Sequence, residues 1–416
     1  MKRVVITGLG AITPLGNDVE TFWNNLLEGK SGALTITRFN PENYKTKFAC
    51  EVKDFDIEKY LQKKDARKMD LYTQYAIGAA EECMVDCGFN TSDWDRSQAG
   101  VIWASGIGGI QTFEEELLNF AQDIENPRFS PFFITKMIPN MAAGQLSIRY
   151  GLRGVSYTTV SACASSNNAI ADAFNFIRLG KAKAILTGGS EAPITRTAVG
   201  GFNASKALST NNEDSRGASR PFDEARDGFV IGEGAGALML EELDHALDRG
   251  AKIYGELIGC GCASDAFHIT ASHPDGLGAA QAMQEAMRDG GIRSEEVDYI
   301  NAHATSTPVG DISECKAISA VFEKSLARLH VSATKSMTGH LLGAAGAIEA
   351  IACLKAIVNG KIPPTINLKN IDAAINPQLQ LTPNQVMEKE INIAMNNTFG
   401  FGGHIAVSVF KKYVPR

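Results

Sequence analysis

The residue in this chain best placed for nucleophilic chemistry is Cys163, which lies in a run of small side chains, Val160–Ile170. The preceding segment, Val155–Val160, is rich in β-branched and aromatic residues and predicts a short buried strand. The following segment, Ala169–Ile177, has apolar residues at helical spacing. We therefore expect Cys163 in a tight strand-to-helix turn, where the free N–H groups and the dipole of the helix favour a thiolate. A buried, inert cysteine is the ordinary alternative, but the turn context favours a reactive thiol.

Two of the seven histidines lie where predicted strands or helices meet turns. His303 follows the strand-like run Val297–Ala302, and His340 lies at the expected start of a helix. Open α/β sheets bind ligands at strand ends, so both imidazoles are candidates for acid–base chemistry. A lone histidine is more often structural, and that is the expectation for the other four that we considered: His245, His268, His273 and His330.

Three further features could support these histidines. Lys335 precedes His340 closely, and Glu349 lies on the helix that His340 is expected to begin. Lys–Glu pairs are ordinarily structural, but here such a pair could set the protonation state of the histidines. Near the C-terminus, Asn396–Gly403 is a Gly-rich loop between predicted strands. It could contribute a backbone N–H to an oxyanion hole and move an aromatic gate.

Length and composition narrow the class of protein. The chain has 416 residues, 44% hydrophobic and 21% charged, which is typical of a globular protein of two or three packed units. Its net charge of −7 argues against general nucleic-acid binding. No apolar run approaches the roughly 18 residues of a membrane span, so no membrane segment is expected. The chain begins directly with the strand-like run Val4–Gly10, without the features of a signal peptide.

The cysteine pairs outside the elbow and the glycines after the first strand do not indicate a metal site or a nucleotide site. The chain has eight cysteines in all. A chain of this length with a thiol that must stay reduced indicates a reducing cytosol. The pairs Cys83/Cys87 and Cys260/Cys262 have no matching His or Cys pair nearby, so we expect packing rather than a metal site. Val4–Gly10 lacks the third glycine and the immediate helix of a dinucleotide fingerprint.

A basic cluster, Lys63–Lys68, precedes the helix predicted over Tyr72–Cys87. Four of its six residues are positively charged in a protein that is acidic overall. Most such runs are solvated helix ends. The alternative is a docking patch for an acidic partner.

The second part of the chain echoes the first in the same order. The paired segments are Ile6–Gly10 with Leu257–Gly261, Val101–Ile107 with Val297–His303, and Ser161–Asp172 with Thr338–Ala350. We interpret this as a duplication of two β/α halves, residues 1–250 and 251–416, with mostly parallel sheets. His340 then occupies the place that Cys163 occupies in the first half.

Taken together, these motifs resemble the β-ketoacyl-[acyl carrier protein] synthases of the elongating type, closest to synthase II. The resemblance covers essentially the whole chain and rests on Ser161–Cys163, His303–Thr307, Lys335–His340 and Phe399–Gly403. It implies a thiolase-like α/β fold with a duplicated, five-layered αβαβα architecture. It also implies a homodimer, and the composition described above predicts a cytoplasmic protein that binds neither nucleic acid nor membrane.

The resemblance implies a decarboxylating Claisen condensation of acyl- and malonyl-carrier protein in fatty-acid elongation. Cys163 would carry the acyl group as a thioester. His303 and His340 would stabilise the enolate and assist decarboxylation, and the N–H groups of Cys163 and Phe401 would hold the other oxyanion. Lys335 and Glu349 match the supporting pair of the family. No cofactor is implied beyond the 4′-phosphopantetheine arm of the acyl carrier protein.

The resemblance also assigns binding residues. Phe401 matches a gating aromatic side chain. The positions that match pantetheine contacts, the walls of the acyl pocket or other substrate contacts are Ile107, Phe202, Thr270, Thr305, Thr307 and Phe399. Those that would present positive charge to the carrier protein are Lys64, Arg67, Lys68 and Lys206.

Two residues depart from the family pattern, and three other classes of protein are alternatives to it. Ala304 replaces the usual glycine, and Ile405 stands where a polar residue is commoner. These departures weaken the case for the fatty-acid enzyme against a relative in polyketide or aryl-polyene synthesis, but they leave the Cys-His-His set intact. A thiolase would need a second reactive cysteine in a C-terminal Cys-x-Gly motif, and Gly402-Gly403-His404 stands there instead. A non-catalytic chain-length subunit would lack the nucleophile, whereas Cys163 is present.

Overall fold

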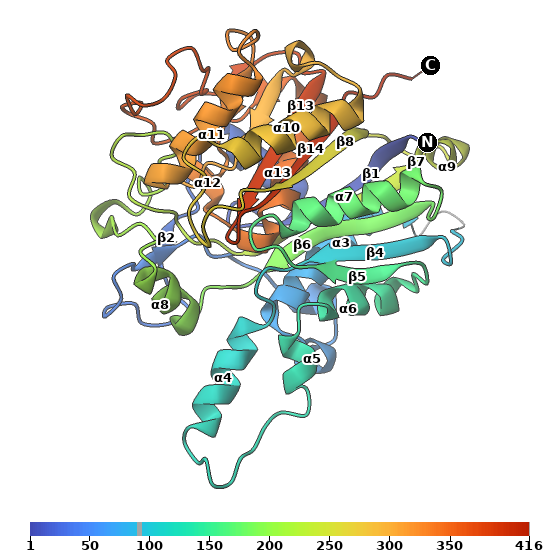
Figure 1. Cartoon of the computed structure of the whole chain (residues 1–416). Helices are drawn as coiled ribbons and strands as arrows, with labels where there is room; N and C mark the ends of the chain where they lie inside the picture. Colours follow the sequence, from blue (N-terminus) through green and yellow to red (C-terminus); the bar gives the residue numbers. More distant parts are fainter. Residues whose placement is uncertain (90–93, 416) are drawn as a thin grey trace.

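The computed structural model describes residues 1–89 and 94–415 and is built around one ten-stranded sheet (Figure 1). The first half of the chain contributes β1 (Val4–Ile12), β4 (Ala99–Ala104), β5 (Ser156–Thr159), β6 (Ala184–Glu191) and β7 (Gly234–Glu242). The second half contributes β8 (Gly255–Ser264), β9 (Tyr299–Asn301), β10 (His330–Ser332), β13 (Ile393–Gly400) and β14 (His404–Lys411). Two small ribbons lie outside this sheet: β2 (Leu34–Thr35) with β3 (Phe48–Ala49), and β11 (Lys361–Ile362) with β12 (Met387–Glu388).

The order of the ten strands reads the same from both ends. It is β5-β4-β6-β7-β1 in one half and β10-β9-β13-β14-β8 in the other, and β1 pairs with β8 through three antiparallel residue pairs. In each half four strands run in one direction, and only β7 or β14 runs against them. The expected division at residue 250 falls between helix α9 (Leu243–Asp248) and β8.

Helices cover and separate the two half-sheets in five layers, as expected from the sequence. The helices of the first half are α1 (Val19–Leu27), α2 (Lys63–Ala66), α3 (Leu71–Asp86), α4 (Ile110–Phe120), α5 (Phe133–Met137), α6 (Met141–Tyr150), α7 (Ser165–Arg178) and α8 (Arg196–Ala204). Those of the second half are α10 (Leu277–Gly290), α11 (Pro308–Val321), α12 (Lys335–Thr338) and α13 (Ala345–Asn359). The pair α7 and α13 lies between the half-sheets, α3 and α6 cover one outer face, and α10 and α11 cover the other.

The central helix α13 corrects one expectation from the sequence. The stretch Leu342–Asn359 is long and apolar enough to cross a membrane, although no such run was expected. Because 89% of this stretch is buried inside the protein, we interpret it as a core helix between two sheets. Small side chains such as Ala347 and Ala350 let it pack closely on both sides.

Strand β5 also differs from the expectation of a buried strand over Val155–Val160. It is the terminal strand of the sheet, so Tyr157 and Thr159 are half-buried and Val160 is 58% exposed. A run of β-branched residues predicts a strand but not its position in the sheet, because position depends on the order in which strands pair.

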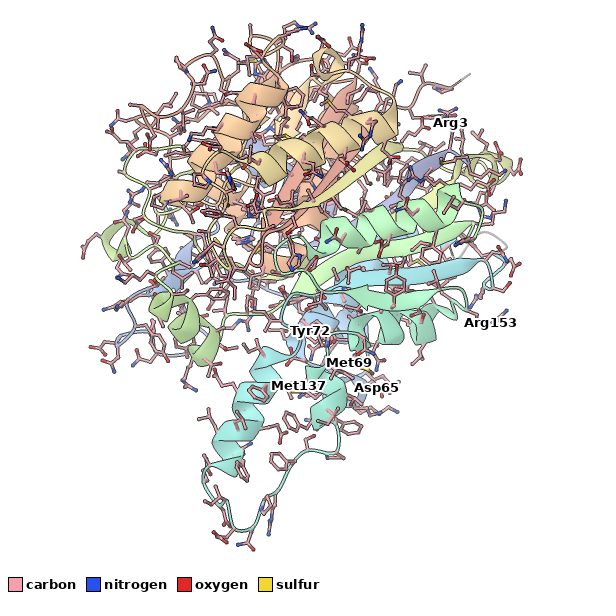
Figure 2. All side chains as sticks on the ribbon, in the orientation of Figure 1. Arg3, Asp65, Met69, Tyr72, Met137 and Arg153 are labelled. Carbon is pink, nitrogen blue, oxygen red and sulfur yellow. The ribbon has the colours of Figure 1, made fainter. Side chains whose placement is uncertain are left out.

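An arm formed by α4 and α5 projects from the body of the protein (Figure 1). Its root lies against the start of α3, where Met69, Tyr72 and Met137 lie near one another (Figure 2). The Tyr72 hydroxyl donates to the carbonyl of Ile138 at 2.7 Å, and Asp70 accepts from both the N–H and the hydroxyl of Thr112. Both ends of the arm are therefore tied to the same helix.

Candidate active site

Cys163 lies in the expected turn between β5 and α7 and is 8% exposed. The turn is strained at Ala162, whose φ of 50° lies in the left-handed region that larger residues avoid. Ser165 closes it, because its hydroxyl accepts from the N–H of Ser161 at 2.8 Å and donates to the carbonyl of Ala162 at 2.6 Å. The side chain of the nucleophile is thus aimed by its immediate neighbours.

The expected stabilisation of a thiolate is wrong for this elbow. Burial raises the pKa of the Cys163 thiol to about 12, and the positive charge of Lys335 and the backbone N–H of Phe401 offset this only in part. The elbow precedes the N-terminus of α7, but burial is the largest influence on the pKa of the thiol. Cys163 therefore rests as a thiol and needs a base.

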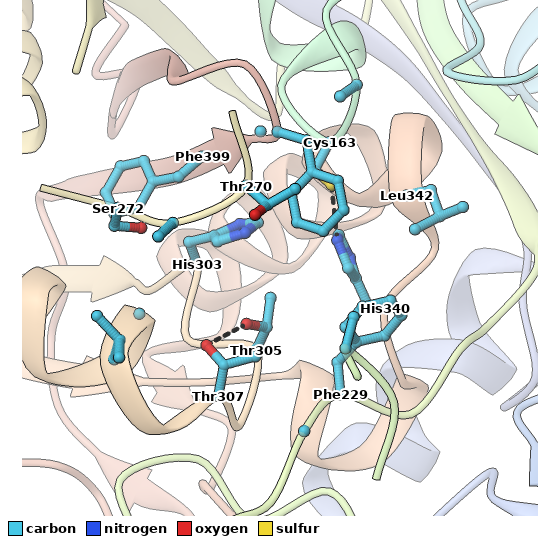
Figure 3. A pocket seen from close by; sticks show the side chains of 18 of the residues that line it. Cys163, Phe229, Thr270, Ser272, His303, Thr305, Thr307, His340, Leu342 and Phe399 are labelled. Carbon is cyan, nitrogen blue, oxygen red and sulfur yellow. Dashed lines mark hydrogen bonds between the residues drawn. The ribbon is translucent and has the colours of Figure 1, made fainter. Parts of the chain in front are cut away.

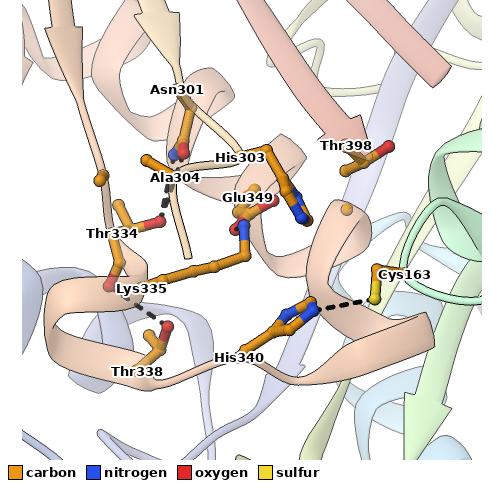
Figure 4. Close-up of polar contacts among 12 residues, drawn as sticks. Cys163, Asn301, His303, Ala304, Thr334, Lys335, Thr338, His340, Glu349 and Thr398 are labelled. Carbon is orange, nitrogen blue, oxygen red and sulfur yellow. Dashed lines mark hydrogen bonds and ion pairs between the residues drawn. The ribbon is translucent and has the colours of Figure 1, made fainter. Parts of the chain in front are cut away.

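One basic side chain, His340, lies within hydrogen-bond distance of this thiol. Its Nε2 lies 2.9 Å from Cys163 Sγ (Figure 4). Its backbone is fixed on both sides, because its N–H donates to the carbonyl of Val230 and its carbonyl accepts from Gly232. It does not begin a long helix as expected: α13 starts at Ala345. Between them, Leu342 adopts a φ of 46° and interrupts helical geometry.

His303 faces His340 from the other side of the site, directly after β9 as expected. The two imidazole rings lie 5.3 Å apart, nearly perpendicular. The buried carboxylate of Glu314 accepts from the N–H groups of His303 at 2.9 Å and Ala304 at 2.7 Å, and from the Asn397 side chain at 3.0 Å. The Ala304 methyl is accommodated within the buried loop.

Lys335 and Glu349 form a fully buried ion pair behind the histidines (Figure 4). Burial raises the pKa of Glu349 to about 7, against the attraction of Lys335. Burial also holds the pKa of both imidazoles well below 6.5, and the nearby Lys335 charge lowers it further. Both histidines are therefore neutral at pH 7. Within the described part of the chain, neither Nδ1 atom has a hydrogen-bond partner.

Cys163, His303 and His340 line one cavity of about 550 Å³ that is built from both halves of the chain (Figure 3). Thr305 and Thr307 lie side by side along it, with their hydroxyl oxygens 3.2 Å apart. The sequence-predicted residues that line the cavity are Ile107, Cys163, Phe202, Lys206, Thr270, His303, Thr305, Thr307, His340, Phe399 and Phe401. Those predicted to bind a partner at the surface, Lys64, Arg67 and Lys68, are exposed at α2 and the turn after it.

Sequence reasoning missed the buried carboxylates Glu191 and Glu314. Glu191 ends β6, is fully buried and lines the cavity. A signal was available, because a charged residue in an otherwise apolar and glycine-rich strand must find polar partners or remain unpaired at high cost. The partners themselves lie far away in sequence and could not be named.

Comparisons with known proteins place this site in a family. The family model "Beta-ketoacyl synthase, N-terminal domain" matches residues 1–246, and "Beta-ketoacyl synthase, C-terminal domain" matches residues 254–369. The chain is 50% identical over 415 residues to a 3-oxoacyl-[acyl-carrier-protein] synthase 2 of Staphylococcus aureus, covering 99% of each protein.

Solved structures agree with this match. A ketosynthase in complex with its type II polyketide acyl carrier protein and bound to a hexaketide has a TM-score of 0.92 at 34% identity, covering 99% of this chain and 100% of that one. The ishigamide ketosynthase/chain length factor has a TM-score of 0.93 at 34% identity with the same coverage. The chain belongs to the β-ketoacyl synthase family, and its duplicated five-layered architecture is the thiolase-like fold of these ketosynthases.

We predict that His340 makes stability depend on pH below its ordinary pKa of 6.5. The unfolded chain takes up a proton there, whereas the folded imidazole stays neutral. The free energy of unfolding should therefore fall by about 1 kcal/mol between pH 6.5 and 5.5 for this residue, and by about 1.4 kcal/mol per pH unit further below. In His340→Gln, urea unfolding between about pH 6.5 and 5.5 should show a slope reduced by about 1 kcal/mol per pH unit. Equal slopes in the wild type and the variant would mean that folded His340 is charged.

Proposed function

We propose that this protein condenses an acyl chain with a malonyl unit, both carried by acyl carrier protein, to give 3-oxoacyl-carrier protein, CO₂ and free carrier protein in fatty-acid elongation. The observation that carries the proposal is the arrangement of Cys163 Sγ at 2.9 Å from His340 Nε2, with neutral His303 beside them. The synthase 2 relative, at 50% identity over nearly the full length of both chains, points to the same reaction.

The first half-reaction transfers the acyl group to Cys163. As the sulfur attacks the acyl thioester, its proton moves to His340 Nε2, because the buried thiol does not ionise on its own. The backbone N–H groups of Phe401 and Cys163 both lower the pKa of the thiol, and at this place they would stabilise the tetrahedral oxyanion. The pantetheine thiolate leaves with the proton.

The second half-reaction uses the neutral imidazoles as hydrogen-bond donors. Malonyl-carrier protein loses CO₂, and N–H groups of His303 and His340 hold the enolate oxygen that forms. The enolate carbon attacks the Cys163 thioester, and the tetrahedral intermediate collapses and expels the Cys163 thiolate. The thiolate takes up one proton from solvent, which is the proton that the overall condensation consumes. Charged imidazoles would repel the Lys335 ammonium, so their low pKa suits this role.

The remaining cavity residues divide between the two ends of the substrate. Thr270, Thr305 and Thr307 supply hydroxyl groups for the pantetheine arm, whereas Ile107 and Phe202 form an apolar wall for the acyl chain. Phe399 packs on His303, and Phe401, which is 36% exposed on the hairpin turn, acts as the gate. The chemistry uses side chains and backbone groups alone, so it calls for no cofactor beyond the phosphopantetheine of the substrate.

A related ketosynthase of type II polyketide or aryl-polyene synthesis is the second candidate. The polyketide ketosynthases similar in structure are 34% identical to this chain, against 50% for the fatty-acid synthase 2 relative. Ile405 packs its side chain against Gly278 beside the cavity, where a polar residue was expected from the family pattern. The sequence identity favours fatty-acid elongation.

Acyl carrier protein is the partner we propose for the basic surface formed by Lys64, Arg67 and Lys68. A structurally similar ketosynthase was solved with its own carrier protein. Lys68 pairs with Asp65 at 2.8 Å, which leaves Lys64 and Arg67 better placed to meet an acidic protein. Lys206 lines the cavity and would attract the phosphate of the arriving arm.

We also propose a homodimer. The terminal strand β5 leaves a sheet edge available, and Ile148 and Val160 near it are 76% and 58% exposed. A two-fold axis would let this edge pair with its copy and cover these apolar side chains. The ishigamide ketosynthase is likewise paired with a second subunit, its chain length factor.

For the compartment we propose the cytoplasm. All eight cysteines are free thiols, and Cys163 must stay reduced to accept an acyl group. Cell fractionation tests this proposal, and recovery from the membrane or the secreted fraction would contradict it.

The thioester can be observed directly. Wild-type protein incubated with acyl-carrier proteins of graded chain length should gain the mass of one acyl group, and Cys163→Ala should not, because the attacking sulfur is absent. Intact-mass spectrometry measures both. Cys163→Gln should also lose acylation yet still release CO₂ from malonyl-carrier protein, since His303 and His340 remain. Folded wild-type protein that accepts no acyl group from any carrier would exclude the condensing function.

Charge reversal tests the docking surface. The double variant Lys64→Glu/Arg67→Glu should raise the KM for acyl-carrier protein about tenfold at low ionic strength with kcat unchanged, because charges at an interface rim act on encounter. The effect should shrink as salt is added. Arg293→Glu, at an exposed position of the second half, is the matched control. A KM that responds equally in both proteins would remove α2 from the docking surface.

The oligomeric state tests the β5 edge. Val160→Glu should shift the protein towards monomer in sedimentation equilibrium, because a carboxylate would be buried at the paired edge. Leu179→Glu introduces the same charge at an equally exposed position, 58%, and should stay dimeric. A wild-type monomer, or a dimer unaffected by Val160→Glu, would show that β5 is not the interface.

A further inference from the structure

Glu191 joins two segments of the cavity wall that come from different halves of the chain. Its Oε1 accepts from the Ser105 hydroxyl at 2.7 Å and the N–H of Ile107 at 3.2 Å. Its Oε2 accepts from the N–H of Gly106 at 2.8 Å and of Gly343 at 3.0 Å. All four partners are donors, so the carboxylate has an acceptor role at each of its hydrogen bonds.

The two segments meet at backbone contact, with Glu191 beside the junction. A methyl group at Gly343 would lie 2.4 Å from the N atom of Gly106, and one at Gly106 would lie 2.6 Å from Glu191 Oε2. The methyl group at Gly106 would also lie 3.4 Å from the carbonyl oxygen of Ala162, in the elbow before Cys163. Side chains are therefore excluded from this junction, and its geometry depends on the carboxylate.

The segments held by Glu191 form the wall of the acyl pocket rather than the histidine pair. Ile107 and Leu342, next to the bonded N–H groups, both line the cavity and pack in the same apolar cluster as Cys163. His340 has separate anchors at Val230 and Gly232, and His303 has its own at Glu314. Loss of the Glu191 contacts would therefore loosen the wall before it disturbs the histidines.

Glu314 makes the equivalent hydrogen bonds to a loop in the second half of the chain. It accepts from the consecutive N–H groups of His303 and Ala304, which follow β9, as Glu191 accepts from those of Gly106 and Ile107, which follow β4. Strands β4 and β9 occupy equivalent places in the mirrored strand order. A buried carboxylate thus holds the equivalent loop in each half, one carrying a histidine and the other a pocket wall.

We propose that Glu191 is a positioning residue for acyl-chain selection: it fixes Ile107 and Leu342 as a rigid wall against which a long acyl chain is held while Cys163 attacks. This inference rests on the proposed function. A short acyl group reaches Cys163 without contacting Ile107 and Leu342, so its transfer does not depend on Glu191.

The test compares transfer of dodecanoyl and acetyl groups from carrier protein to Cys163 in wild type and Glu191→Gln. The glutamine side chain has nearly the same volume as glutamate, but its NH₂ group cannot accept hydrogen bonds from the N–H donors that the carboxylate binds. Dodecanoyl transfer should fall about tenfold or more, since small displacements of a bound reactant cost that much. Acetyl transfer, alkylation of Cys163 by iodoacetamide and CO₂ release from malonyl-carrier protein should stay within about twofold of wild type.

Two further variants keep the result interpretable. Glu241→Gln alters an equally buried carboxylate on β7, bonded to Thr7 and Arg249 far from the cavity, and should leave the dodecanoyl-to-acetyl ratio unchanged. If Glu191→Gln fails to fold, Ser105→Ala removes one donor to the carboxylate and should lower the same ratio about threefold.

The outcomes separate the two proposals. Wild-type protein that accepts neither acyl group contradicts the proposed function itself. Wild-type protein that accepts both, with an unchanged dodecanoyl-to-acetyl ratio in Glu191→Gln, overturns the positioning role while the function stands. A parallel loss of dodecanoyl transfer, acetyl transfer and iodoacetamide alkylation also overturns it, because that result indicates general disruption of the site.

Discussion

The chemistry of this site depends on one cation buried in a closed cavity. The Lys335 ammonium lies against Glu349 with both side chains almost fully removed from solvent. In a medium of low dielectric its field reaches both imidazoles and the thiol, lowering the pKa of each. For the imidazoles this field adds to the effect of burial, and for the thiol it opposes burial. The same charge thus helps to keep the histidines neutral and stabilises the anionic form of the Cys163 sulfur.

A buried cation of this kind requires a scaffold that does not open. The half-sheets enclose α7 and α13, and these helices bring the elbow of Cys163 and the segment of His340 to the same end of the protein. Backbone contact between Gly106 and Gly343 joins the halves without intervening side chains. The duplication therefore supplies two equivalent loop sites, one of which carries Cys163 and the other His340.

Local features of the site could be predicted from the sequence, and features that depend on burial could not. The elbow at Cys163 and the strand end before His303 are set by neighbouring residues, and both are where the sequence indicated. The raised pKa of Cys163 results from surrounding segments that close over it. For the same reason β5 was taken as buried, and the break at Leu342 before α13 was missed. The role of Glu191 could not be predicted, because the backbone N–H groups that it binds lie between 84 and 152 residues away along the chain.

The position of β1 has a consequence for how the chain is made. This apolar N-terminal strand is the first to be synthesised, yet both of its neighbours in the sheet, β7 and β8, come from residues 234–264. During translation at about 5–20 residues per second, β1 waits on the order of ten seconds or more without a partner. A strand with such distant pairing partners folds slowly, and its apolar side chains stay without their native partners until those strands are made. The seam that unites the two halves is thus completed only after β8 has been made.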